Sequence, residues 1–395
     1  MAKKQAKTYE LLTRGVEQVV PEEVAEGKLR SGKKLRVYLG IDPTGSKLHI
    51  GHSVPLRKLQ AFADAGHEAI FLIGSFTAMI GDPTGRDAAR QPLTREQVEA
   101  NFQTYKKQAG RILDFSKVTI RYNHEWLEKL SSAETFKIMS HFTIQQMLQR
   151  DMFKERMKHD EDLSPMEFMY PLMQAYDSVV LDVDAEIGGN DQLFNMLCGR
   201  KLQERYGKRE KFVIATKLLE GLDGRKMSKT YGNAVNITDE PNDMFGKIMS
   251  LRDDLIIRYF ELCTDVPLAE IEGIKKSLKA GGNPRDAKAR LAREIVEMYH
   301  GAKAAQAAEK EFNAVFRSGA LPADIPKKKV SGKQKQADEL LVALGLAQSR
   351  SEAKRLIEQG GVRMNGAVLS DWKERVDIKK GAVVQVGKRR FVEIS

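Results

Sequence analysis

Two short stretches of this 395-residue chain carry side chains suited to phosphate chemistry. In DPTGSKLHIGH, His49 and His52 stand three residues apart directly after a hydrophobic run. In GRKMSKTYGN, Lys226 and Lys229 have the same spacing within a glycine-flanked segment. Imidazole and ammonium groups both donate hydrogen bonds to phosphate oxygens and stabilise charge that develops there during a reaction. The two stretches together predict a site that binds a polyphosphate.

Each stretch alone also has an ordinary structural explanation. An isolated histidine pair more often belongs to a core or a turn, and loop lysines usually face water. If Asp42 ends a strand and a helix begins near Gly51, however, the histidines lie at the carboxyl edge of a sheet, where open α/β domains bind ligands. That helix offers free backbone N–H groups to an anion, and Gly51 lets a base or ribose approach the backbone. The pairing of the two stretches favours the functional interpretation.

The elements that must position these residues follow from the hydrophobic pattern. Short aliphatic runs alternate with amphipathic stretches through residue 222, which is typical of a parallel sheet covered by helices. The predicted strands are residues 36–41, 69–74, 118–123, 184–188 and 212–216. Helices are predicted at residues 54–65 and 166–180, with added helical stretches at 96–111 and 136–157. The predicted fold class is α/β, with a Rossmann-like doubly wound parallel sheet.

The rest of the chain divides into smaller parts. Strand patterns disappear between residues 236 and 316, which predicts an α-helical domain. Prolines and a run of three lysines then indicate a linker, and the last 60 or so residues predict two helices followed by strands, with a hairpin turn at Asn365-Gly366. We expect a catalytic domain at residues 1–222 with a helical insertion, a helical domain with the lysine stretch at 223–320, a linker at 321–334 and a small α+β domain at 335–395.

Composition restricts the class of protein. The net charge is +11, and residues 327–395 hold 16 Lys and Arg against 8 Asp and Glu, an excess that indicates a polyanionic partner such as RNA or DNA. Solubility alone is the alternative reason for such charge. The two cysteines exclude a disulfide framework and argue against a cysteine zinc site. Apolar runs such as AIFLIG are far shorter than the roughly 20 residues of a membrane helix, and no export signal is evident, so we expect a cytoplasmic protein.

HIGH at residues 49–52 together with KMSK at 226–229 is the double signature of the class I aminoacyl-tRNA synthetases. Over nearly its whole length the chain resembles the bacterial tyrosyl-tRNA synthetases. The resemblance implies activation of L-tyrosine by ATP to tyrosyl-adenylate and pyrophosphate, and then transfer of tyrosine to the 3′ end of tRNA(Tyr). It also implies a homodimer. We expect ATP with Mg²⁺ as substrate, no protein-bound metal and no membrane association.

A polar stripe in YPLMQAYD indicates the amino-acid pocket. Tyr170, Gln174 and Asp177 fall on one helical face of an otherwise apolar stretch, which favours a cavity lining over a solvated face. The resemblance places Asp177 and Tyr38 at the substrate phenol, and Tyr170, Gln174 and Asp82 around its ammonium group. A buried carboxylate and hydroxyl left without partners would disfavour phenylalanine, so no editing domain is expected.

The resemblance further implies a set of nucleotide contacts. The residues expected to be catalytic are His49, His52, Lys226 and Lys229. The residues expected to bind ATP are Gly40, Asp42, His49, Gly51, His52, Asp191, Lys226, Met227 and Lys229. In GGNDQ, Gln192 is expected to contact the substrate carboxylate, whereas Asn190 and Leu193 depart from the familiar branch of the family and indicate the other bacterial branch.

The C-terminal region resembles the S4 RNA-binding domain through GLAQSRSEAKRLIEQGGVRMNG. Arg350, Lys354 and Arg355 lie close together on a short predicted helix and are expected to contact RNA phosphates. A helix that merely carries ion pairs is the alternative. The resemblance implies that this domain holds the long variable arm of the tRNA.

Two rival functions remain open at this point. A tryptophanyl-type synthetase shares the nucleotide signatures, although Asp177 and the S4-like domain argue against it. A synthetase-derived RNA-binding regulator without catalysis is the second rival, and it would need neither HIGH nor KMSK.

Overall fold

The structure, a computed structural model, describes residues 10–45, 47–83, 93–227, 231–318, 325–387 and 390–395. The chain forms two compact units: the first takes in Met1–Glu240 and Lys247–Gly301, and the second takes in Pro241–Gly246 and Ala302–Ser395. The four-part division expected from the sequence stays a prediction. No helix among the described residues is long and apolar enough to cross a membrane.

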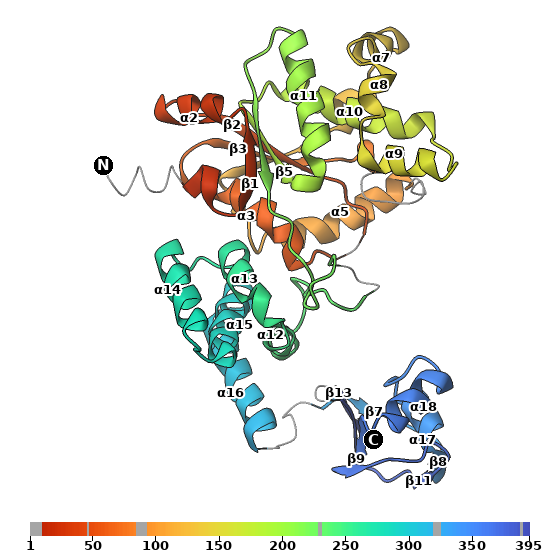
Figure 1. Ribbon diagram of the computed structural model, residues 1–395. Coiled ribbons are helices and arrows are strands. Elements are labelled where there is room, and N and C mark those ends of the chain that lie inside the picture. Colours follow the sequence, from red (N-terminus) through yellow and green to blue (C-terminus); the bar gives the residue numbers. More distant parts are fainter. Residues whose placement is uncertain (1–9, 46, 84–92, 228–230, 319–324, 388–389) are drawn as a thin grey trace. The chain divides into compact units, whose positions relative to one another are not determined.

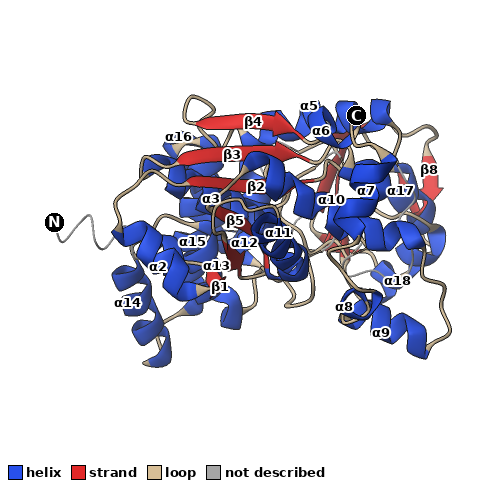
Figure 2. Ribbon diagram, turned by 90° about the horizontal axis from the view of Figure 1, so that it is seen from above, coloured by secondary structure: helices blue, strands red, loops and turns tan. Residues whose placement is uncertain are grey.

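A six-stranded sheet forms the centre of the first unit (Figure 1). Its strands are β1 (Val16–Val20), β2 (Arg36–Ile41), β3 (Glu68–Ile73), β4 (Val118–Tyr122), β5 (Ala185–Gly189) and β6 (Phe212–Thr216). Their order is β1-β6-β5-β2-β3-β4, and Figure 2 shows β4, β3 and β2 side by side. The five predicted strands are confirmed to within a residue or two.

One strand departs from the expected parallel sheet. β1 pairs antiparallel with β6, with Val20 opposite Val213, so the sheet is mixed. The sequence VEQVV of β1 is mostly half-buried, because an edge strand has only one neighbour and lacks the continuous apolar run of a central parallel strand. This is why the hydrophobic pattern did not reveal it.

Helices cover both faces of the sheet. Those of the first unit are α2 (Glu22–Arg30), α3 (Ile50–Asp64), α4 (Thr77–Ile80), α5 (Arg95–Ala109), α6 (His124–Leu127), α7 (Ser132–Met139), α8 (Ile144–Met147), α9 (Asp151–Lys158), α10 (Pro165–Leu181), α11 (Leu193–Arg205), α13 (Ile256–Cys263), α14 (Leu268–Lys279) and α15 (Pro284–His300), while α12 (Pro241–Met249) spans the unit boundary. The β2-α3-β3 and β5-α11-β6 connections leave the β2/β5 junction in opposite directions, so right-handed crossovers place α3 and α11 on opposite faces (Figure 1).

The prediction of one continuous helical stretch at residues 136–157 was wrong. The stretch comprises the end of α7 and the short helices α8 and α9. Thr143 begins α8 as its N-cap, and its hydroxyl accepts a hydrogen bond from the backbone N–H of Gln146. A cap of this kind starts a new helix instead of extending the previous one.

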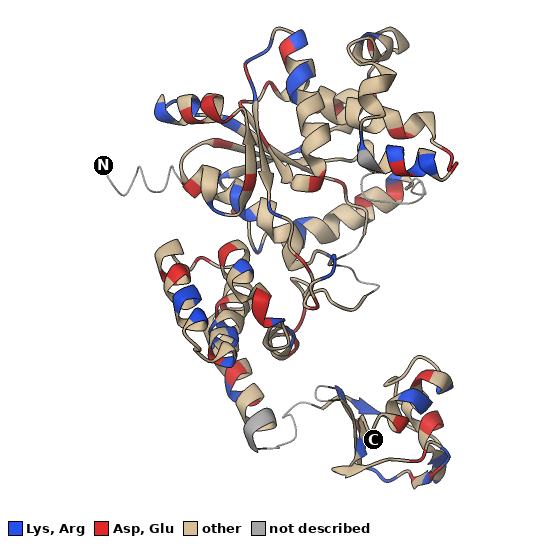
Figure 3. Ribbon diagram, in the orientation of Figure 1, with Lys and Arg blue, Asp and Glu red and all other residues tan. Residues whose placement is uncertain are grey.

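The second unit contains α16 (Ala302–Ser318) and a small α+β domain. The domain elements are β7 (Lys327–Lys328), β8 (Gln334–Gln336), α17 (Ala337–Ala343), α18 (Arg350–Glu358), β9 (Val362–Met364), β10 (Ala367–Val368), β11 (Arg375–Asp377), β12 (Val383–Val386) and β13 (Arg390–Ile394). Asn365 and Gly366 have φ values of 49° and 87°, which confirms the predicted two-residue hairpin turn between β9 and β10. Figure 3 shows Lys and Arg on α18 and on strands of this domain.

Candidate active site

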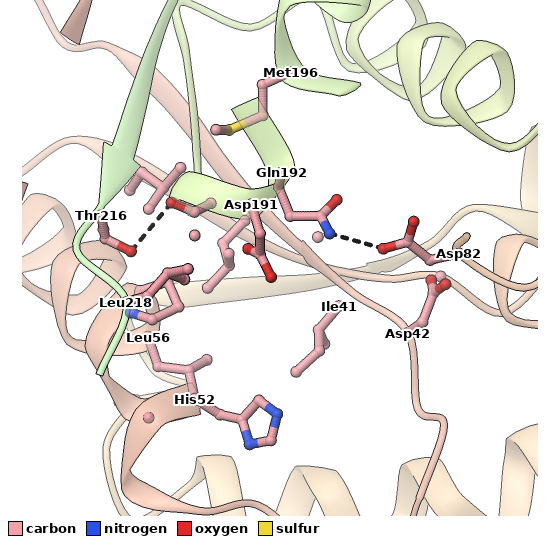
Figure 4. Close-up of a pocket in the computed structure, with 18 of the residues that line it drawn as sticks. Ile41, Asp42, His52, Leu56, Asp82, Asp191, Gln192, Met196, Thr216 and Leu218 are labelled. Carbon is pink, nitrogen blue, oxygen red and sulfur yellow. Dashed lines mark hydrogen bonds between the residues drawn. The ribbon is translucent and has the colours of Figure 1, made fainter. Parts of the chain in front are cut away.

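A cavity of about 660 Å³ opens at the carboxyl ends of the parallel strands. It lies around the β2/β5 junction, where neighbouring crossovers diverge and leave a crevice. The described residues predicted for tyrosine and ATP all line it: Tyr38, Gly40, Asp42, His49, Gly51, His52, Asp82, Tyr170, Gln174, Asp177, Asp191, Gln192, Lys226 and Met227. Lys229 lies outside the described residues. Figure 4 shows several of these side chains around the opening.

The histidine stretch forms the beginning of α3. His49 is the N-cap residue with extended backbone, and its N–H donates to Nδ1 of His52 at 3.2 Å. The two rings stack with their centroids 3.7 Å apart. A Cβ on Gly51 would lie 2.9 Å from Nδ1 of His49, so only glycine leaves that ring in its place. The histidine pair therefore has one defined arrangement at a helix N-terminus that favours anions.

The lysine stretch is joined to the histidine stretch by backbone hydrogen bonds. The N–H of Ile50 donates to the carbonyl of Val235 at 2.9 Å, and the N–H of Ile237 donates to the carbonyl of Leu48 at 3.0 Å. These bonds bring the chain that follows KMSK alongside HIGH. The two signatures, almost 180 residues apart in sequence, consequently border the same cavity.

The base of the lysine stretch is tied by side chains on both of its flanks. Asn233 Nδ2 donates to Asp223 Oδ1 at 2.8 Å and to the carbonyl of Lys226 at 3.1 Å. The hydrogen bond from Asn233 is the main cause that lowers the pKa of Asp223 to about 2. The guanidinium of Arg225 lies 4.6 Å from the ring centre of Tyr231. Lys226 itself is exposed at the cavity.

Asp177 is a buried carboxylate at the inner end of the cavity. Its oxygens accept from Trp126 Nε1 at 2.8 Å and from Asn123 Nδ2 at 3.2 Å. Burial raises the pKa of Asp177 well above its usual value, and these two donors oppose that rise. Leu172 and Met173 of α10 pack in the hydrophobic core and do not line the cavity, as the polar stripe predicted.

Asp42 is part of the same polar network. Its carboxylate accepts from the hydroxyl of Tyr170 at 2.9 Å and from Thr77 Oγ1 at 2.7 Å. A Cβ on Gly74 would lie 1.8 Å from Asp42 Oδ1, so glycine is required there. The geometry thus connects Asp42, which was predicted for ATP, directly to a residue predicted for tyrosine. Burial raises the pKa of Tyr170, which keeps its hydroxyl protonated as a donor.

A second chain of hydrogen bonds begins at the end of β5. Gln192 Nε2 donates to Asp82 Oδ2 at 2.7 Å (Figure 4). Asn195 Nδ2 donates to Gln192 Oε1 at 2.8 Å. Thr216 Oγ1 donates to the carbonyl of Gly188 at 3.1 Å and holds the end of β6 against β5. Asp82 and Gln192 are therefore oriented toward each other.

Sequence reasoning missed four side chains of this site: Thr77, Asn123, Trp126 and Asn195. None of them belongs to a recognisable motif. Asn123 follows directly after β4, so its place at the carboxyl end of a predicted strand was the one available signal. The indole N–H of Trp126 could not be inferred, because its partner lies 51 residues away on another element.

The three predicted RNA contacts lie on α18 in the second unit. Arg350 donates to the buried carboxylate of Asp338 at 2.8 Å and lies 3.1 Å from Glu339. The ammonium of Lys354 lies 4.7 Å from the ring centre of Trp372, and Arg355 is exposed. The guanidinium of Arg350 is thus paired within the domain, Lys354 lies 3.8 Å from Glu358, and all three side chains are exposed.

Two family profiles and several curated relatives match this chain. The profile of tRNA synthetases class I (W and Y) matches residues 30–317, and that of the S4 domain matches residues 337–384. A tyrosine–tRNA ligase of Idiomarina loihiensis is 48% identical over 387 residues, covering 97% of this chain and 96% of that protein. A tyrosine–tRNA ligase of Moorella thermoacetica is 45% identical over 395 residues, covering 98% and 96%.

Solved structures show the same likeness. The crystal structure of a C-terminally truncated mitochondrial tyrosyl-tRNA synthetase of Aspergillus nidulans has a TM-score of 0.67 at 26% identity and covers 78% of this chain and 94% of its own. The tyrosyl-tRNA synthetase of Archaeoglobus fulgidus complexed with L-tyrosine has a TM-score of 0.62 at 25% identity, covering 78% and 99%.

Proposed function

The chain belongs to the class I tRNA synthetases of the tryptophan and tyrosine family, and from this premise we propose that it is a tyrosine–tRNA ligase whose cavity performs both steps of the reaction. It activates L-tyrosine with ATP and transfers the tyrosyl group to the 3′ end of tRNA(Tyr). The observation that carries the amino-acid specificity is the buried Asp177 carboxylate, held by two donors beside Tyr38.

In this proposal the substrate phenol donates its hydrogen to Asp177, and Tyr38 forms the second hydrogen bond. Phenylalanine would leave the buried Asp177 carboxylate without its substrate donor. The free energy cost of leaving a buried carboxylate unsatisfied exceeds the net stabilisation that one hydrogen bond provides. Tryptophan presents an indole N–H at a different place on a larger ring. Both considerations favour tyrosine.

The substrate ammonium group lies, in this proposal, among Tyr170, Gln174 and Asp82. Gln174 supports the assignment, because its Nε2 donates to Glu186 while its Oε1 is buried and has no hydrogen-bond partner among the described residues. A buried acceptor at the cavity wall is well suited to an ammonium N–H. Gln192 is placed to meet the substrate carboxylate.

Activation needs no nucleophile from the protein. An oxygen of the tyrosine carboxylate attacks the α-phosphorus of ATP, a new oxygen–phosphorus bond forms, and the bond from that phosphorus to the bridging oxygen breaks. Pyrophosphate leaves with the electron pair. Catalysis then consists of positioning and charge stabilisation, for which we assign His49 and His52 to the reacting phosphate and Lys226 and Lys229 to the departing one.

ATP is held, in this proposal, by the residues of β2, α3 and β5 that border the cavity mouth. Gly40 and Gly51 leave room for the nucleoside, and Asp191 contacts it. Met227 lines the cavity from the lysine stretch. Mg²⁺ enters with ATP as part of the substrate and neutralises phosphate charge. We propose no separate protein-bound metal.

The second unit supplies the RNA contacts in this proposal. Its S4 domain carries Lys354 and Arg355 on the outward side of α18, where they can meet phosphates of tRNA(Tyr). The relatives are bacterial tyrosine–tRNA ligases, and we propose a cytoplasmic location for this chain.

We also propose a homodimer. Five of the nine large hydrophobic side chains that are exposed in the described part of the chain lie between residues 136 and 166: Phe136, Met139, Ile144, Met157 and Met166. Such a concentration is typical of a protein interface. Sedimentation velocity should show a dimer for the natural chain, and Ile144→Asp should shift it toward monomer. A natural chain that sediments as a monomer at micromolar concentration would remove this part of the proposal.

The decisive experiment is amino-acid-dependent ATP–pyrophosphate exchange, measured with each of the twenty amino acids in turn. Exchange with tyrosine alone supports the proposal. Exchange driven by tryptophan would support the rival synthetase, and the absence of exchange with any amino acid would support the RNA-binding regulator.

A further inference from the structure

A buried ion pair lies behind the amino-acid end of the cavity. The side chains of Lys211 and Glu186 are 0% and 2% exposed, and their charged groups are in direct contact. Glu186 comes from β5 and lines the cavity, and Lys211 directly precedes β6. Such a pair seldom adds net stability, because the desolvation of two ions offsets their attraction. Its presence beside a binding pocket therefore needs a reason other than stability.

The ion pair is connected to two side chains that we assign to the substrate. Glu186 Oε1 accepts from Gln174 Nε2 at 3.0 Å. Lys211 Nζ donates to Ser178 Oγ at 2.6 Å, and Ser178 Oγ lies 2.9 Å from the hydroxyl of Tyr38. The ammonium of Lys211 also lies 5.6 Å from the centre of the Tyr38 ring. One charge pair thus reaches both the phenol end and the ammonium end of the pocket.

The connection through Ser178 is directional. An ammonium group can only donate, so Lys211 occupies one lone pair of Ser178 Oγ. The single hydrogen and remaining lone pair of that oxygen are then shared between Tyr38 and the Glu186 carboxylate, which is 3.4 Å away. The ion pair consequently determines how the Tyr38 hydroxyl is hydrogen-bonded on its inner side. The inner hydrogen bond in turn determines whether the Tyr38 hydroxyl presents its hydrogen or a lone pair to a substrate.

A glycine in α11 leaves the space for this network. Gly199 lies in the middle of the helix, where alanine is the better helix former. A Cβ at this position would lie 2.6 Å from both Lys211 Nζ and Ser178 Oγ, and 3.3 Å from Glu186 Oε2. The network therefore excludes any side chain at position 199.

We infer that the Glu186–Lys211 pair positions the Tyr38 hydroxyl through Ser178 and the Gln174 amide directly, and that it thereby sets the selectivity for tyrosine over phenylalanine. Lys211 and Ser178 are positioning residues, since they act through Tyr38. The inference rests on the proposed tyrosine activation and on the assignment of Tyr38 to the substrate phenol.

Ser178→Ala tests the inference while leaving both charges in place. In the exchange assay, kcat/KM for tyrosine should fall about fivefold to tenfold through KM for tyrosine, as expected for one misdirected hydrogen bond. The KM for ATP and the kcat/KM for phenylalanine should change by less than about twofold, because neither involves the phenol contact. In a Tyr38→Phe background, Ser178→Ala should have no further effect on selectivity.

Gly199→Ala disturbs the network from α11, which also contributes the carbonyl of Met196 as an acceptor from Lys211 Nζ at 3.3 Å. It should lower the tyrosine-to-phenylalanine ratio as Ser178→Ala does. Gly273→Ala is the matched control, because Gly273 lies within α14 and a methyl group added there would meet no atom within 4 Å. This control should leave the ratio unchanged.

Three results separate the possible failures. A natural chain without tyrosine-dependent exchange would contradict the proposed function itself. Exchange with an unchanged tyrosine-to-phenylalanine ratio in Ser178→Ala would overturn the inference alone, and so would full additivity of Ser178→Ala with Tyr38→Phe. The double variant Glu186→Gln/Lys211→Met removes both charges together, so a variant that melts like the natural chain and keeps its selectivity would also overturn it.

Discussion

At the scale of single residues, the indole N–H of Trp126 should affect the binding of tyrosine, although Trp126 does not line the cavity. Trp126→Phe keeps the aromatic ring but removes the donor to Asp177, a hydrogen bond to a carboxylate worth roughly 1.5 to 3 kcal/mol. KM for tyrosine should rise about tenfold or more, with little change in KM for ATP, in steady-state exchange kinetics. Trp372→Phe in the second unit is the control. Equal KM values for the two variants would contradict the role of Trp126.

The raised pKa of the Asp177 carboxylate predicts that the stability of the folded protein depends on pH. Because the pKa of Asp177 is raised in the folded protein, the folded state holds this proton more tightly than the unfolded chain, and stability falls as pH rises from the unfolded pKa of about 3.9 through the raised value. Asp177→Asn removes that dependence. Urea unfolding without tyrosine should show the natural chain losing stability relative to Asp177→Asn above about pH 4. A difference that is constant, or that grows in the other direction, would contradict the raised pKa.

Single residues were also where the sequence was least informative. HIGH, KMSK and the stripe on α10 could be identified because their spacing is local. The donors to Asp177 could not, because Asn123 and Trp126 are 54 and 51 residues away and nothing local marks them as partners. The orienting function of Thr77 likewise depends on a tertiary contact, because Asp42 is 35 residues away. Asn195 differs, since its partner Gln192 is only three residues away.

At the scale of elements, a substitution in the first turn of α3 should stabilise the helix and slow catalysis at the same time. Gly51→Ala should favour the helix by about 0.5 to 1 kcal/mol, yet its Cβ would displace the ring of His49. Adenylate formation, followed by stopped-flow, should slow about tenfold or more, a loss of about 1.4 kcal/mol at the transition state. The melting temperature should not fall.

The matched control for that substitution is Gly27→Ala in α2, which meets no atom within 4 Å. It should raise the melting temperature slightly and leave adenylate formation unchanged. If both variants keep full activity, the position of the His49 ring is unimportant and its assignment to the reacting phosphate is wrong.

The elements themselves were predictable to different degrees, for physical reasons. The strands β2, β3, β5 and β6 lie inside the sheet, and their apolar runs predicted them correctly. β4 is an edge strand and mostly half-buried, and the β-branched residues in VTIRY predicted it instead. β1 is an edge strand with a half-buried sequence, and its antiparallel pairing with β6 depends on a partner nearly 200 residues later. Within residues 136–157 the helical pattern hid the breaks, because capping by Thr143 involves side-chain geometry that periodicity does not record.

At the scale of the whole molecule, the two arginines of α18 should separate RNA binding from domain stability. Arg355→Ala should weaken tRNA binding and reduce the slope of log K against log salt by about 0.7 to 0.9, the value for one lost phosphate contact. Tyrosine-dependent exchange should be unaffected, because it needs no RNA. Filter binding over a range of salt concentrations measures the slope.

Arg350→Ala should act mainly on stability instead. It removes the partner of the buried Asp338 carboxylate, which should lower the melting temperature of the second unit more than Arg355→Ala does. A full change of salt slope in Arg350→Ala with unchanged melting would show that this guanidinium leaves Asp338 to bind RNA.

The pairing of β1 with β6 has a consequence for synthesis of the chain. Residues 16–20 leave the ribosome early, but their partners at 213–216 follow almost 200 residues later. At about 5 to 20 residues per second, that interval lasts roughly 10 to 40 seconds. The newborn protein therefore carries an unpaired first strand while the rest of the sheet assembles, and a chaperone that shields residues 16–20 during this interval should raise the yield of folded enzyme.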